Sequence, residues 1–168
     1  MKPSAPHYQL KQAGLRSPGT LTLAITGACN LACHHCWVRA GEVSSPGDVP
    51  LGTVRRIVKE FAQLGGRAIR LTGGEPLCHP DWLEIVGLCC SLGFAAVTLQ
   101  TNAMLLQAEH LALLHADDFP GLSIQVSLDG ASPQTHDLVR GEGAFSRALQ
   151  GIELLVREGL AARTSIFL

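Results

Sequence analysis

Three cysteines lie close together in the segment Cys29-Asn-Leu-Ala-Cys33-His-His-Cys36. Thiolates are soft ligands that suit iron–sulfur clusters or zinc. Because all three follow a short β-prone run on one loop, their sulfurs can converge on one small inorganic core. In a [4Fe–4S] cluster, three cysteine ligands leave one iron open to a chelating substrate. The spacing therefore predicts a cluster that does chemistry.

A zinc site is the alternative for the same cysteines, with His34 or His35 as the fourth ligand. Both histidines lie between two of the cysteines, so the chelate rings would be cramped. A second pair of ligands at zinc-finger spacing does not follow in the sequence. The residues favour the cluster and leave zinc as the second interpretation.

A second motif, Thr72-Gly73-Gly74-Glu75-Pro76, directly follows another apolar run. Glycines let a backbone approach a ligand closely, and we expect a side chain at Gly74 to block that approach. The neighbouring carboxylate can accept hydrogen bonds from an ammonium group. The segment by itself is also compatible with an ordinary strand-to-helix turn.

Together, these motifs resemble the signature of the radical S-adenosylmethionine (radical SAM) superfamily. In that family the cysteines hold a [4Fe–4S] cluster, and Gly-Gly-Glu-Pro binds the methionyl amino group of SAM. The position before the third cysteine, usually aromatic and near the adenine, is His35 here. The resemblance thus implies metal ligands at Cys29, Cys33 and Cys36, and SAM contacts at His35, Gly73, Gly74, Glu75 and Pro76.

Two later segments resemble further family motifs. Thr101-Asn102-Ala103 is similar to a Thr-Asn-Gly turn, and Ser127-Leu128-Asp129-Gly130 to a Ser-Leu-Asp-Gly segment. With His136-Asp137 and Arg140-Gly141 after it, the run is typical of the peptide- and cofactor-maturing branches called SPASM-type. By resemblance, Ser127 and Asp129 lie near the ribose or carboxylate of SAM, and Arg140 is a candidate carboxylate partner. Ordinary turns and a helix-capping charge are the alternative.

The resemblance, which covers residues from about 20 to 168, implies an enzyme. It implies reductive cleavage of SAM to a 5′-deoxyadenosyl radical that abstracts a substrate hydrogen, in peptide or cofactor maturation. A reduced flavodoxin or ferredoxin is the expected electron donor, and a peptide is a candidate substrate. A catalytically incompetent iron–sulfur fragment and a zinc-binding structural module stay open as alternatives.

Strand-like and helix-like segments alternate along the chain. We expect strands at 21–26, 68–72, 96–101, 123–128 and 164–168, and helices at 54–64, 81–92, 106–115 and 145–156. Such alternation predicts an α/β fold with a curved parallel sheet and right-handed crossovers. About four β/α units plus a fifth strand predict an open, partial (β/α) barrel, with its site at the carboxyl ends of the strands.

Composition sets the remaining expectations. Residues 1–18 are polar and proline-rich, so we expect a flexible arm, followed by a radical SAM core domain, 19–168, that is incomplete at the C-terminus. A net charge of −1 without a Lys/Arg stripe gives no indication of a nucleic-acid partner. We recognise neither a signal peptide nor a membrane span. Six cysteines without a secretory signal indicate the reducing cytoplasm.

Overall fold

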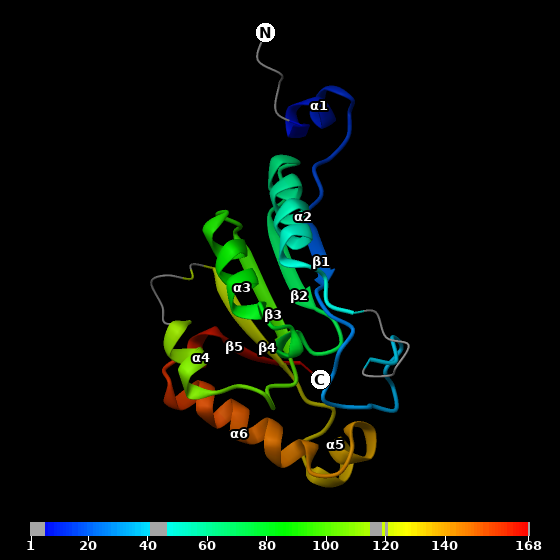
Figure 1. The fold of residues 1–168 in the computed structure, drawn as a ribbon, viewed down its shortest axis with the longest axis vertical. Helices are drawn as coiled ribbons and strands as arrows, with labels where there is room; N and C mark the ends of the chain where they lie inside the picture. The colour runs from blue at the N-terminus through cyan, green and yellow to red at the C-terminus, as the bar shows by residue number, and fades with distance from the viewer. Residues whose placement is uncertain (1–5, 41–46, 115–118, 120, 168) are drawn as a thin grey trace.

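A computed structural model describes residues 6–40, 47–114, 119 and 121–167 of the chain. One curved sheet contains five parallel strands in the order β1-β2-β3-β4-β5 (Figure 1). The strands are β1 Thr20–Ala24, β2 Ala68–Thr72, β3 Ala96–Thr101, β4 Leu122–Ser127 and β5 Thr164–Phe167. Each strand pairs in parallel with the next along the chain, which confirms the predicted partial (β/α) barrel.

The helices α2, α3, α4 and α6 follow one another around this sheet (Figure 1). Helical segments are α1 Pro6–Gln12, α2 Leu51–Gln63, η1 Pro76–Cys78, α3 Trp82–Ser91, α4 Ala108–Leu113, α5 Pro133–Arg140, α6 Ala144–Arg157 and η2 Ala161–Arg163. The sequence did not predict α5, although this helix contributes to the site. None of the described helices is both long enough and apolar enough to cross a membrane.

Helix α2 shows how local sequence sets an element. Val54, Val58 and Phe61 recur at helical spacing and are the buried residues of its inner face. The helix ends where Gly65 adopts a positive φ of 80°, a conformation that glycine reaches without a Cβ clash. The spacing of these apolar residues therefore lays α2 against the sheet.

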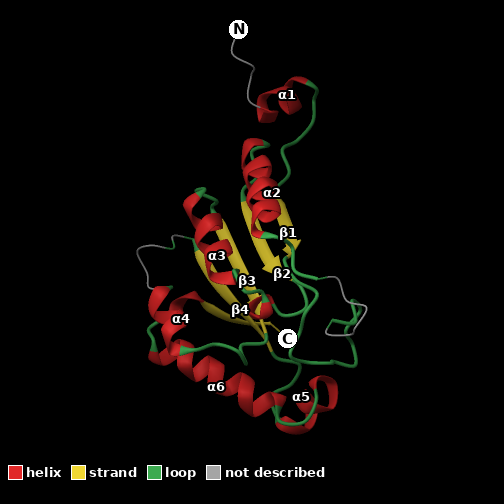
Figure 2. Ribbon diagram, viewed as in Figure 1, coloured by secondary structure: helices red, strands yellow, loops and turns green. Residues whose placement is uncertain are grey.

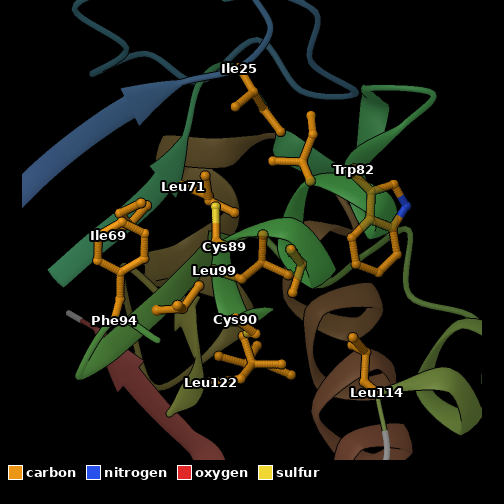
Figure 3. Close-up of a cluster of buried hydrophobic side chains, with 14 of the residues drawn as sticks. Ile25, Ile69, Leu71, Trp82, Cys89, Cys90, Phe94, Leu99, Leu114 and Leu122 are labelled. Carbon is orange, nitrogen blue, oxygen red and sulfur yellow. The ribbon is translucent and has the colours of Figure 1, made fainter. Parts of the chain in front are cut away.

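The core lies between the helices and one face of the sheet. Alternate residues of β3 and β4 are buried, as the pleat of a strand requires. Cys89 and Cys90 of α3 are buried in this cluster, among aliphatic and aromatic side chains (Figure 3). Both cysteines are therefore small core residues.

The opposite face of the sheet is polar along β2, β3 and β4. Arg70 of β2 stands in register with Thr98 of β3, and Thr98 shares a 3.1 Å hydrogen bond with Ser123 of β4. Gln100 and Gln125 continue this polar face towards the carboxyl ends of the strands. The alternation thus separates an apolar core from a polar interior.

Three helical segments need separate description. Helix α1 contains seven residues of the N-terminal arm and lies apart from the sheet (Figure 1). The helix expected at 106–115 is shortened to α4, and residue 115 lies outside the described residues. Val156 of α6 is 56% exposed, because the buried face of this helix is formed by Ala144, Ala148, Gly151 and Leu155.

Candidate functional site

One cavity of about 330 Å³ lies at the carboxyl ends of the strands. Figure 2 shows the loop after β1 and the segment leading to α5 at this same end of the sheet. The structure brings twelve of the thirteen predicted site residues into its lining: Cys29, Cys33, His35, Cys36, Gly73, Gly74, Glu75, Thr101, Asn102, Ser127, Asp129 and Arg140. Pro76 is the exception, because it begins η1 and is buried outside the lining.

The cysteine loop and the glycine turn are joined through their backbones. The N–H of Gly74 donates to the Thr26 carbonyl at 2.8 Å, and the N–H of Glu75 donates to the Ala28 carbonyl at 2.8 Å. A Cβ at position 74 would stand 2.2 Å from the Ala28 oxygen. The absent side chain therefore makes room for the cysteine loop, while Gly74 also lines the cavity.

Glu75 is almost fully buried, with 2% of its surface exposed. Its Oε1 accepts hydrogen bonds from the Thr101 hydroxyl at 2.5 Å and the Leu77 N–H at 3.2 Å, and its Oε2 accepts from the Asn102 N–H at 2.8 Å. Burial raises the pKa of Glu75, and these donors oppose the rise. A carboxylate has about four acceptor positions, so roughly one is left for a ligand cation.

The end of β3 is tied to the cysteine loop through side-chain amides. Asn102 Nδ2 donates to Asn30 Oδ1 at 2.8 Å. The next residue, Ala103, has a φ of 64°, the left-handed conformation that favours the glycine of the family's Thr-Asn-Gly turn. Its N–H donates to the Thr101 hydroxyl at 3.0 Å, which supports this turn.

The three cysteines share the cavity as free thiols. Burial raises the pKa of Cys29 to about 11 and also raises that of Cys33, where Arg140 acts in the opposite direction. Because the thiolate is the ligating form, metal binding must displace protons here. Cys78 lies outside this lining, and burial raises its pKa as well.

The donor set of this cavity suits an iron–sulfur group, because three cysteine thiols share its lining. Within the described ranges, no three His, Cys, Asp or Glu side chains are arranged to hold one metal ion. Three cysteine sulfurs in one cavity lining suit a cluster, because its several iron atoms can each bind a different cysteine.

A second group of residues lines the same cavity from β4 and α5. Arg140 Nε donates to Asp129 Oδ2, and His35 Nε2 stands 3.8 Å from the same oxygen. The His34 N–H also donates to the Val139 carbonyl of α5 at 2.9 Å. Helix α5 therefore contacts the cysteine loop directly and places Arg140 beside it.

Sequence reasoning missed several lining residues. They are Leu31, Trp37, Val38, Ala40, Thr72, Gln100 and Phe167. Gln100 could have been predicted from the two-residue period of a strand. It lies two positions before Asn102, so both side chains point to the same face of the sheet. Trp37 directly follows the third cysteine and is 90% exposed, so its ring stands at the mouth of the cavity.

Comparison with known proteins identifies the family. The radical SAM superfamily profile matches residues 23–168, so the chain belongs to the radical SAM superfamily. Members of this superfamily use SAM and an iron–sulfur cluster. The predicted resemblance to the superfamily is thereby confirmed.

Several curated relatives are similar over most of this chain. Mycofactocin maturase MftC of Mycobacterium ulcerans is 35% identical over 148 residues, which are 88% of this chain and 39% of the relative. The AdoMet-dependent heme synthase of Methanosarcina barkeri is 39% identical over 142 residues, or 83% of this chain and 39% of the relative. The chain thus spans less than half the length of these relatives.

Solved structures share the fold at lower identity. SuiB of Streptococcus suis bound to precursor peptide SuiA superposes with a TM-score of 0.77 at 21% identity, covering 95% of this chain and 35% of SuiB. Native anSMEcpe with bound AdoMet gives a TM-score of 0.70 at 22% identity, covering 88% of this chain and 43% of anSMEcpe. These likenesses support the partial barrel.

Proposed function

We propose that this chain carries the SAM-cleaving part of a radical SAM maturation enzyme, with a [4Fe–4S] cluster on Cys29, Cys33 and Cys36. The observation that carries the proposal is the shared cavity, where three thiols, a buried carboxylate and an arginine face one space. When bound, the cluster and SAM supply the one-electron chemistry that yields a 5′-deoxyadenosyl radical.

The protein side chains divide the recognition of SAM. Glu75 has about one free acceptor position, which suits the methionyl ammonium. Arg140 uses its Nε on Asp129 and keeps its terminal N–H groups for a carboxylate. Ser127 and Asp129 provide polar groups for the carboxylate or the ribose, and His35 offers an imidazole face for the adenine.

A peptide or a peptide-derived cofactor is the proposed substrate class. The support is that MftC is a mycofactocin maturase and that SuiB was solved with its precursor peptide. A small reduced flavodoxin or ferredoxin is the proposed electron donor. We assign the protein to the reducing cytoplasm, since its six cysteines are free thiols.

Anaerobic reconstitution with iron and sulfide tests the proposal. We expect wild-type protein to bind iron and sulfide in the equal amounts of a [4Fe–4S] cluster. It should release 5′-deoxyadenosine from SAM when dithionite is added. Cys33→Ala should lose the cluster. Cys89→Ala is the matched control, because Cys89 is a core residue and should leave the cluster intact.

The outcomes separate the alternatives. A cluster that forms without releasing deoxyadenosine would identify an incompetent iron–sulfur fragment. Stoichiometric zinc, with no cluster after reconstitution, would identify the zinc module. Equal iron content in Cys33→Ala and wild type would contradict the ligand assignment.

A further inference from the structure

His136 of α5 is a buried histidine that the proposed function does not use. Its side chain is 1% exposed and lies outside the cavity lining. Its Nδ1 accepts a hydrogen bond from the backbone N–H of Asp129 at 3.1 Å. Its ring also meets the Phe145 ring edge-on, with 5.7 Å between the centroids. His136 thus stands directly behind the strand end that presents Asp129.

The other ring nitrogen of His136 meets no hydrogen-bond partner within the described part of the chain. Because Nδ1 accepts a hydrogen bond, the proton of the neutral ring must be on Nε2. Among the described residues, Nε2 is buried and meets no hydrogen-bond partner. An unsatisfied buried donor is unfavourable, and a phenylalanine would fill this space without one. The feature that an imidazole adds here is its acceptor for Asp129.

The contact continues from His136 to the cavity. Asp129 accepts from Arg140 Nε and lies 3.8 Å from His35 Nε2. Arg140 and Asp129 have side chains that are 12% and 25% exposed, so the pair is held mostly by protein. If the Asp129 backbone shifts, its carboxylate and the guanidinium that it orients must shift with it. Asp129 is therefore the single residue that separates His136 from the cavity.

We infer that His136 is a positioning residue for SAM binding, whose neutral imidazole fixes Asp129 and thereby Arg140 along the cavity wall. This inference rests on the proposed function, because it takes SAM as the ligand of the Asp129–Arg140 pair. Protonation would place an N–H on Nδ1, opposite the Asp129 N–H. Two donors would then face each other, and the bond that holds the strand end would be lost.

The surroundings of His136 keep the ring neutral. Burial lowers its pKa, and the Arg140 guanidinium lowers it further, while the carboxylates of Asp129 and Asp137 act in the opposite direction. The neutral ring therefore predominates at neutral pH, and the positioning bond is lost in acid. His35 faces Asp129 from the cysteine loop and is therefore kept in every variant.

The test compares two variants with a control. His136→Asn places an oxygen acceptor at the position of Nδ1 and cannot titrate, whereas His136→Phe keeps a ring of similar size and removes the acceptor. His110→Phe is the control. Among the described residues His110 also has a buried Nδ1 without a partner, but its ring packs against Trp82, with 5.3 Å between the ring centroids. SAM affinity of the reconstituted full chain is measured by equilibrium dialysis from about pH 5.5 to about pH 7.5.

We expect His136→Phe to bind SAM about tenfold more weakly at the upper pH. His136→Asn and His110→Phe should stay within about twofold of wild type there. Wild-type affinity should fall towards acid pH by more than that of His136→Asn, which lacks the titrating ring. The inference would be overturned if His136→Phe bound SAM as tightly as wild type, or if wild type and His136→Asn had identical pH profiles.

A second measurement needs neither cluster nor SAM. In cluster-free protein, the NMR amide signal of Asp129 should titrate together with the His136 ring, and the His136→Asn variant should lose that titration. An Asp129 amide that ignores the protonation of His136 would overturn the inference even if SAM binds. If wild type binds no SAM, the proposed function fails, and this titration then decides alone whether His136 positions Asp129.

Discussion

Replacing Gly74 with alanine tests whether the glycine turn and the cysteine loop form one unit. The new Cβ would stand 2.2 Å from the Ala28 carbonyl oxygen, 2.8 Å from its carbonyl carbon and 2.8 Å from the Gly27 oxygen. All three atoms belong to backbone, which cannot rotate aside as a side chain can. The two segments must separate, and the cysteine loop must move away from β2.

The cost follows from the contacts that would be lost. Separation weakens the hydrogen bonds from Gly74 to Thr26 and from Glu75 to Ala28, each 2.8 Å long. Each such bond stabilises by about 0.5–1.5 kcal/mol, and overpacking a tight site costs about 1–3 kcal/mol. We therefore expect Gly74→Ala to lower the free energy of unfolding by roughly 2–6 kcal/mol, a large share of the stability of a domain.

Urea unfolding of the cluster-free protein, followed by circular dichroism, measures this loss. Iron and sulfide per chain after reconstitution measure the effect on the cysteine loop, and we expect both to fall. Gly52→Ala is the matched control, because nothing lies within 4 Å of its Cβ and its position is helical. A Gly74→Ala protein with wild-type stability and iron content would refute the argument.

Two further predictions concern buried or capping carboxylates. Because burial raises the folded-state pKa of Glu75 above its ordinary value of 4.5, wild type should lose stability relative to Glu75→Gln as pH rises from 4.5 through that raised pKa. A stability difference between wild type and Glu75→Gln that stays the same at every pH would contradict this prediction. Asp137→Ala removes acceptors 2.9 Å and 2.7 Å from the N–H groups of Gly143 and Phe145 at the start of α6, so thermal unfolding should show a loss of about 1–2 kcal/mol. Glu153→Ala on the exposed side of α6 should change stability little, and an equal loss there would argue against capping.

Local sequence determined the chemistry-bearing motifs and the positions of the strands along the chain. The spacing from Cys29 to Cys36 is set within one loop, so it could be recognised without knowing the fold. Strand-like and helix-like segments alternate along the sequence, and this alternation identified all five strands. Successive strands lie side by side in the sheet because the connections between them are short. Since parallel strands end at one edge, the shared position of most site residues also followed from the sequence.

Helix α5 illustrates where sequence reasoning ended. Its eight residues contain one fully buried side chain, His136, while Leu138 is 75% exposed. Such a segment lacks the apolar period that reveals a helix. The histidine-aspartate pair was visible in the sequence, but its roles were not, because each partner lies elsewhere along the chain.

Only the tertiary structure decided which groups touch. The fold places the Ala28 backbone where a side chain on residue 74 would lie. It also places the His136 ring against the Asp129 N–H. Both contacts depend on how a loop or helix packs against a neighbouring strand end. Spacing along the sequence carries no information about that packing, since it arises from the burial and hydrogen bonding of segments that meet only in the folded chain.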